Sequence, residues 1–127
     1  MKQPTEPEAQ LPLSSAAFHI LLALSEGERH GYGIMQETAR SSEGKVNLGP
    51  GTLYRTIKRL LDDGLIEESA ERPVPELDDE RRHYYRLTPF GLSVARAEAQ
   101  RLAALVRIAQ AKQLLPQPGV VTLEGRA

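Results

Sequence analysis

Cysteine and tryptophan are both missing from the 127 residues, and aromatic residues make up only 5% of them. Without cysteine the chain can form neither a disulfide bond nor a thiolate metal site, so a cysteine-type zinc finger is excluded. No apolar run approaches the roughly 18 residues that a membrane-spanning helix needs. The first dozen residues are polar and rich in proline, unlike a secretory signal peptide. We therefore expect a cytoplasmic protein with no membrane partner.

Residue patterns for catalysis and metal binding are missing as well. The histidines, His19, His30 and His83, show neither HxxxH nor HExxH spacing. The sequence contains no GxSxG elbow, no phosphate-binding loop and no recognisable pair of catalytic carboxylates. We therefore predict that the chain is not an enzyme and that it holds neither a metal nor another cofactor.

Charge is distributed unevenly along the chain, although its net value is only -1. The charged side chains in residues 45–61 are all basic: Lys45, Arg55, Lys58 and Arg59. Residues 62–80 contain nine acidic residues and one base, Arg72. A basic block of this kind indicates a local surface for a polyanion such as double-stranded DNA, which the net charge alone would hide.

Apolar residues recur at the period of an amphipathic helix in four segments, at residues 14–28, 30–42, 51–64 and 89–115. A serine can cap the start of the first segment, and glycines end the first and the third. Thr88 is a good N-cap for the last segment, and Pro89 suits its first helical position. The last helix would be about 40 Å long at ~1.5 Å per residue, longer than a compact domain needs.

Two short strands are expected at residues 65–70 and 82–88. Tyr85 falls on the apolar face of the second strand, so we expect it in the core. Val46 and Leu48 alternate with polar residues and could form one further strand. The resulting order of elements is that of a winged helix-turn-helix. We therefore predict a mainly α (α+β) fold with a long C-terminal dimerisation helix.

This prediction divides the chain into four parts. They are a disordered N-terminal tail at residues 1–12, a winged helix-turn-helix DNA-binding domain at 13–88, a C-terminal dimerisation helix at 89–115 and a flexible tail at 116–127.

The third helical segment is the best candidate for contacting DNA. A recognition helix needs an apolar face that anchors it and a basic face that enters the major groove. Its N-terminal end should bring Thr52, Tyr54 and Arg55 near bases or phosphates, although Tyr54 could instead be half-buried packing. Lys58 and Arg59 suit phosphates, or could simply solvate an exposed face. The further candidates for DNA contact are Lys45, Arg81, Arg82 and Arg86.

The segment between the two strands is unusual for a wing that grips DNA. It reads ERPVPELDDER, with two prolines, no glycine and several carboxylates, which repel phosphates. Arg81, Arg82 and Arg86 could therefore pair with these acids instead of binding DNA. This leaves a second interpretation open, in which the domain is a protein-interaction module that has lost DNA binding.

The last helix carries an apolar stripe whose steps alternate between three and four residues, the heptad pattern of paired helices. Its members are Leu92, Ala95, Ala99, Leu102, Val106 and Ala109, widened by Leu105 and Ile108. The stripe could fold back on its own domain, but it continues beyond the length that the domain needs. We therefore predict a homodimer joined through these residues.

Three stretches of the chain resemble the PadR family of transcriptional regulators. They are ILLALSEGERHGYGIMQET, GPGTLYRTIKRLLDDGLIEE and RRHYYRLTPFG, which together span residues 20–91. The resemblance implies a DNA-binding winged helix, dimerisation through the C-terminal helix and repression of transcription. Some family members respond to small phenolic or drug-like ligands, so a small-molecule effector is also implied. The acidic wing departs from the basic, glycine-containing wing that is common in such domains.

Overall fold

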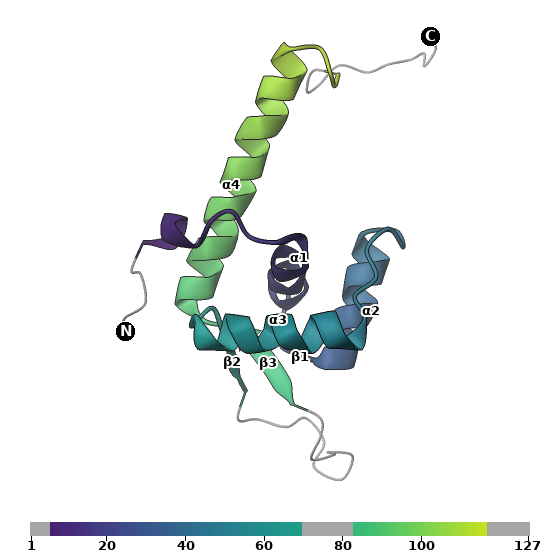
Figure 1. Cartoon of the computed structure of the whole chain (residues 1–127), viewed down its shortest axis with the longest axis vertical. Coiled ribbons are helices and arrows are strands. Elements are labelled where there is room, and N and C mark those ends of the chain that lie inside the picture. The colour runs from purple at the N-terminus through teal and green to yellow at the C-terminus, as the bar shows by residue number, and fades with distance from the viewer. Residues whose placement is uncertain (1–5, 70–82, 117–127) are drawn as a thin grey trace.

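The elements follow the predicted order except for one strand (Figure 1). The computed structural model describes residues 6–69 and 83–116. Within these residues the chain forms η1 (Pro7–Gln10), α1 (Ser15–Leu24), β1 (Arg29–His30), α2 (Gly31–Ser41), α3 (Pro50–Asp62), β2 (Ile66–Glu68), β3 (Tyr84–Leu87) and α4 (Pro89–Ala111). This is the predicted mainly helical α+β fold with a long last helix.

Side chains cap the starts of three helices. The Ser14 hydroxyl accepts a hydrogen bond from the Ala17 amide at 3.1 Å, at the start of α1. His30 caps α2, because its Nδ1 accepts from the Gly33 amide at 3.0 Å. Thr88 caps α4 as predicted, with Pro89 in the first helical position. Each cap satisfies an amide that the helix itself leaves unpaired.

The three strands form one antiparallel sheet in the order β1-β3-β2. Ile66 pairs with Leu87 on one side of β3, and Arg29 pairs with Tyr85 on the other. The third strand of the sheet is therefore β1, which lies before α2. The prediction of a strand at Val46 and Leu48 is wrong. The Val46 amide instead donates to the Ser42 hydroxyl at 2.9 Å, which commits this segment to a turn.

Helix α1 lies at the centre of the domain and packs against α2, α3 and α4. Its Ile20 and Leu21 are fully buried, as are Ile34 of α2 and Leu53 of α3. Tyr85 is 5% exposed and belongs to the same core, which confirms its predicted place. Burial raises the pKa of the Tyr85 hydroxyl, so this side chain stays neutral. The core therefore fixes α3 and the sheet in one rigid domain.

The start of α4 lies directly against the turn that follows α3. Gly64 takes a φ of +78° there, which glycine adopts without strain. The Thr88 hydroxyl donates to the Gly64 carbonyl at 2.7 Å and accepts from the Gly91 amide at 2.9 Å. A Cβ on Gly91 would lie 2.8 Å from the Leu65 carbonyl carbon. The absence of a side chain at Gly91 therefore allows α4 to approach this turn closely.

The N-terminal segment packs across α4 instead of forming a free tail (Figure 1). Leu11 and Leu13 pack against the core, and the Leu13 amide donates to the Glu98 carboxylate at 3.3 Å. The predicted disordered tail is thus wrong for residues 6–12, because η1 contacts α4 and Leu11 packs against the core. Residues 1–5 lie outside the described residues.

Glu98 is a buried carboxylate that joins α4 to this segment, since only 2% of the residue is exposed. Arg101, one turn later, donates to both carboxylate oxygens at 2.7 and 2.9 Å. These hydrogen bonds, with a smaller contribution from the Leu13 amide, hold the pKa of Glu98 below its ordinary value although burial acts in the opposite direction. Glu98 is therefore ionised and satisfied inside the fold.

Helix α4 extends well beyond the body of the domain (Figure 1). It ends at Ala111 and not at the predicted Leu115. Gln113 has a φ of +66°, and the Leu114 amide donates to the Ala109 carbonyl at 2.8 Å. This is a Schellman turn, which terminates a helix by satisfying its last carbonyls. The sequence did not predict this helix end, because Gln113 occupies the left-handed position after the helix that is usually a glycine.

Candidate nucleic-acid interface

Helix α3 presents a buried apolar face and an exposed charged face. Leu53, Ile57 and Leu60 are at most 3% exposed and anchor the helix in the core. Arg55 and Lys58 lie on the opposite, exposed face. No side chain caps the start of α3, so the amides of its first turn remain available to an anion. The helix thus has the two faces that the sequence predicted for a recognition helix.

The three cations of α3 differ in their partners. The Arg55 guanidinium donates to the Thr52 hydroxyl on the same face at 3.4 Å and has no carboxylate partner among the described residues. Lys58 forms an exposed ion pair with Asp62, whose Nζ–O distance is 3.3 Å. Within residues 6–69 and 83–116, Arg59 has no acidic partner. Exposed ion pairs of this kind contribute little, so a phosphate can compete for Lys58 as well.

Tyr54 leaves α3 on the side that faces the sheet, and 49% of the residue is exposed. Its ring lies against Gly31, where an added Cβ would meet the Tyr54 ring carbon Cζ at 2.9 Å. The contact with Gly31 agrees with the packing alternative considered for this tyrosine, whereas its contact with DNA stays a prediction. The hydroxyl end of the Tyr54 side chain packs on the start of α2, and about half of the residue remains exposed.

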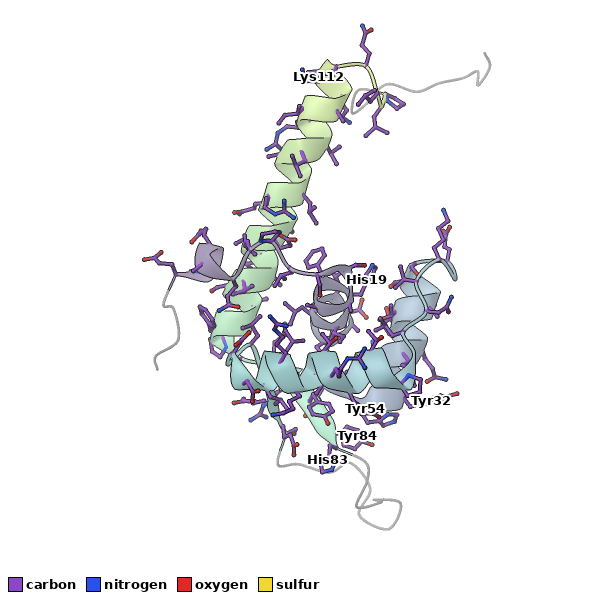
Figure 2. The ribbon with its side chains drawn as sticks, in the orientation of Figure 1. His19, Tyr32, Tyr54, His83, Tyr84 and Lys112 are labelled. Carbon is purple, nitrogen blue, oxygen red and sulfur yellow. The ribbon has the colours of Figure 1, made fainter. Side chains whose placement is uncertain are left out.

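Sequence reasoning missed an aromatic cluster beside Tyr54. The His30 ring stacks on Tyr32 with a centroid distance of 6.5 Å and meets the edge of Tyr84 at 5.2 Å. Figure 2 shows Tyr32, Tyr54, Tyr84 and His83 gathered at the same end of the domain, where α2 begins and the wing strands end. Tyr32 is 60% exposed. The strand pairing that creates the cluster brings residues 30 and 84 together and could not be seen in sequence spacing.

Arg86 of β3 and His83, just before it, each lie near a carboxylate of β2. Arg86 forms an ion pair with Glu67 of β2 at 2.9 Å, and His83 approaches Glu68 at 3.4 Å. This pairing is the alternative that the sequence left open for Arg86. Arg81 and Arg82, with the acidic linker, lie outside the described residues. Lys45 is exposed in the loop between α2 and α3.

The predicted dimer stripe on α4 divides into two parts. Ala95 packs against the core of its own domain, and Leu92 is partly buried. Farther along, Val106 is 43% exposed, as are Leu105 and Ile108 at 49% and 51%. The apolar stripe is thus packed against its own domain at the start of α4, and it is exposed where the helix extends beyond the domain. The remaining members of the stripe are exposed Ala99 and partly buried Leu102 and Ala109.

In the part of the chain that the structure describes, no three histidine or acidic side chains gather as metal ligands would. No helix in the same part is both long and apolar enough to cross a membrane.

Comparison with solved structures gives the class of the fold. A transcriptional regulator from Clostridium thermocellum matches with a TM-score of 0.64 and 24% identity, covering 79% of this chain and 97% of that one. A PadR family regulator from Clostridium difficile matches with a TM-score of 0.64 and 23% identity, covering 79% and 99%. The PcaV regulator of Streptomyces coelicolor, solved with its natural ligand, matches with a TM-score of 0.62 and 23% identity, covering 88% and 66%. The fold is that of the winged-helix regulators.

Sequence comparison gives the family. The sequence profile of the transcriptional regulator PadR-like family matches residues 20–97. A transcriptional regulator of Mycobacterium tuberculosis is 35% identical over 94 residues, which cover 74% of this chain and 81% of that protein. The chain therefore belongs to the PadR-like family of transcriptional regulators. That family consists of regulators and not of enzymes.

Proposed function

We propose that this chain is a cytoplasmic transcriptional repressor that binds a pseudo-palindromic operator as a homodimer and is released from it by a small-molecule ligand. The observation that carries the proposal is the exposed cationic face of α3, on a helix that the core holds rigidly. Arg55 and Arg59 are not engaged by carboxylates of the described residues. Cations in this state can form charge-assisted bonds with DNA without first breaking an internal pair.

Within this proposal, α3 enters the major groove with its first turn leading. Arg55 then reaches base edges together with Thr52, whose hydroxyl the Arg55 guanidinium contacts. Lys58 lies one turn later and meets phosphates. Tyr32, which is 60% exposed at the start of α2, lies beside α3 and can donate its hydroxyl to the DNA backbone.

The uncovered end of α4 supports the homodimer. Leu105, Val106 and Ile108 expose apolar side chains on the part of α4 that extends beyond the described body of the domain. Large exposed apolar patches mark interaction sites. A second copy of the same helix matches this surface, since two-fold pairing places the same residues on both sides. The two α3 helices would then contact half-sites roughly 34 Å, or a multiple of that, apart.

The proposal is tested by measuring fluorescence anisotropy of labelled duplexes over a salt series, after selection of a preferred site from random DNA. We expect a palindromic selected site and a log–log salt slope of about -0.9 for each phosphate contact. Arg96→Ala, which removes an exposed arginine of α4, is the control and should bind as the original chain does. Absence of salt-dependent binding to any duplex would instead favour the protein-interaction module.

A further inference from the structure

Gly31 is the first residue of α2, and its backbone conformation does not require glycine. It is buried, and its φ lies outside the positive range that glycine alone adopts without strain. Alanine forms helices more readily than glycine. The reason for a glycine at this position therefore lies in what a side chain would meet there.

An added Cβ at Gly31 would meet the tip of Tyr54 from α3. It would clash with the Tyr54 hydroxyl oxygen and would lie 2.9 Å from Cζ and 3.1 Å from Cε1. These atoms end a side chain that is 49% exposed and can turn aside, whereas a Cβ on Gly91 would meet backbone. A side chain at Gly31 would therefore displace Tyr54 and leave the domain folded. The missing side chain thus determines where one surface tyrosine lies.

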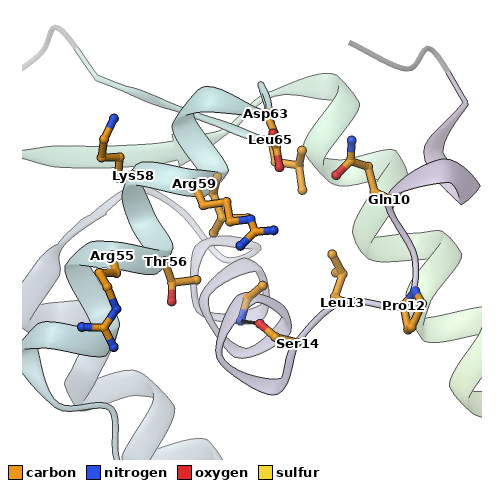
Figure 3. Close-up of a pocket in the computed structure, with 12 residues that line it drawn as sticks. Gln10, Pro12, Leu13, Ser14, Arg55, Thr56, Lys58, Arg59, Asp63 and Leu65 are labelled. Atoms are coloured by element: carbon orange, nitrogen blue, oxygen red, sulfur yellow. Dashed lines mark hydrogen bonds between the residues drawn. The ribbon is translucent and has the colours of Figure 1, made fainter.

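The contact between Gly31 and Tyr54 joins the two segments that are proposed to meet DNA. Gly31 directly precedes Tyr32, whose exposed hydroxyl can reach a phosphate. Tyr54 directly precedes Arg55, which can reach base edges. Arg55 leaves α3 on the side away from the N-terminal segment, whereas Arg59 points toward that segment (Figure 3). The contact therefore relates the proposed phosphate contact to the proposed base contact.

The sheet also holds the start of α2. The His30 ring stacks on Tyr32 with a centroid distance of 6.5 Å and an interplanar angle of 18°. His30 itself pairs with Tyr84 of β3. The start of α2 and the wing strand β3 thus form one unit, which the Gly31–Tyr54 contact connects to α3.

We infer that Gly31 is a positioning residue for DNA recognition: by lacking a side chain it lets Tyr54 pack against α2, which fixes the spacing between Tyr32 and Arg55. The inference rests on the proposed DNA-binding function. Phosphate contacts set the register of a protein on the duplex, and base contacts form only in the correct register. The Gly31–Tyr54 contact therefore affects discrimination between sequences more than the general attraction to DNA.

The contact itself is tested without DNA, in ¹H–¹⁵N NMR spectra of the full chain. Gly31→Ala should shift the backbone signals of Tyr54 and Arg55, which lie on another helix. Gly33→Ala is the control, because its added Cβ would meet nothing nearer than 3.6 Å, and it should leave these α3 signals in place. Unshifted α3 signals in Gly31→Ala would overturn the inference.

The role in recognition is tested by fluorescence anisotropy with the selected duplex and a scrambled one, at a temperature where circular dichroism shows each variant folded. Gly31→Ala should weaken binding to the selected duplex about tenfold or more, the effect of one lost hydrogen bond to a charged group. Binding to the scrambled duplex should change less than about twofold with an unaltered salt slope, because no cation is removed. Gly33→Ala should bind both duplexes as the original chain does. A merely structural role would lower the melting temperature and leave the ratio of the two affinities unchanged, which would overturn the inference.

The assignment to Tyr54 is tested by Tyr54→Leu, whose shorter side chain leaves room beside Gly31. Adding Gly31→Ala to this variant should change neither affinity by more than about twofold, because no ring remains to be displaced. Equal effects of Gly31→Ala in both backgrounds would overturn the inference. Should Gly31→Ala not fold, Tyr54→Leu decides alone, since an unchanged ratio of affinities in it would also overturn the inference. If the original chain bound no duplex, the proposed function would fail, whereas shifted α3 signals would still support the contact.

Discussion

Gly91 offers the sharpest test of how the fold positions its helices, through the substitution Gly91→Ala. The added Cβ would lie 2.8 Å from the Leu65 carbonyl carbon and still closer to its oxygen. These are backbone atoms of the turn that Thr88 ties to α4, so neither side can move without breaking a hydrogen bond. Overpacking of this kind costs about 3 kcal/mol. The better helix propensity of alanine stabilises the fold by about 1 kcal/mol, so the free energy of unfolding should fall by about 2 kcal/mol in total.

Gly33→Ala is the matched control, because Gly33 also lies in a helix and its added Cβ would meet nothing nearer than 3.6 Å. Here only the propensity gain applies, so we expect stabilisation by about 0.5–1 kcal/mol. Thermal and urea unfolding should be followed by circular dichroism at one protein concentration, since a dimer couples stability to concentration. Gly91→Ala should melt about 10 °C lower than the original chain. The reasoning fails if Gly91→Ala is neutral or stabilising, or if both variants shift in the same direction.

Five other substitutions test the surface of α4, the proposed recognition helix α3 and the buried carboxylate Glu98. Leu105→Asp should dissociate the proposed homodimer, because pairing would bury the new charge; sedimentation equilibrium should then give the 14.0 kDa of one chain. Arg55→Ala should weaken binding to cognate DNA by about 1–3 kcal/mol and relax the base preference. Lys58→Ala should weaken binding to all duplexes alike and reduce the salt slope by about one. Equal losses of affinity for cognate and scrambled DNA in Arg55→Ala would refute the role of Arg55. Glu98→Ala should destabilise the fold by about 2 kcal/mol through lost charge-assisted bonds. The folded pKa of Glu98 is lowered, so the stability that its ionisation contributes is complete above its unfolded pKa and is lost as pH falls through the folded pKa. Glu98→Gln lacks this ionisable group. Its urea midpoint should therefore fall less steeply below about pH 4.5 than that of the original chain.

Sequence pattern predicted the helices and their order because their signals are local. The apolar period of each helix, the cap at Thr88 and the glycine that ends α3 all lie within a few residues of the feature that they determine. The same holds for the two faces of α3, where Leu53 and Ile57 are buried and Arg55 is exposed. Local periodicity therefore sufficed to place the candidate interface on this helix.

Two of the errors concern contacts between distant residues. The first strand forms only because β3 offers its edge to Arg29 and His30, and the N-terminal segment packs only because α4 provides an apolar surface and the Glu98 carboxylate. A polar, proline-rich segment gives no local sign of such a partner.

The close contact between the start of α4 and the Leu65 turn has a geometric consequence for DNA recognition. Since α4 is one continuous helix from Pro89 to Ala111, it connects the recognition domain rigidly to the surface proposed for dimerisation. In that dimer, the length of α4 would set the distance between the two α3 helices and so the spacing of the half-sites. One residue inserted after Glu98 would rotate the remainder of the helix by about 100° and turn its apolar surface away from the partner. Seven inserted residues would nearly restore the facing surface while lengthening the helix by about 10 Å, so the spacing of the half-sites in the proposed dimer would change without any change in α3.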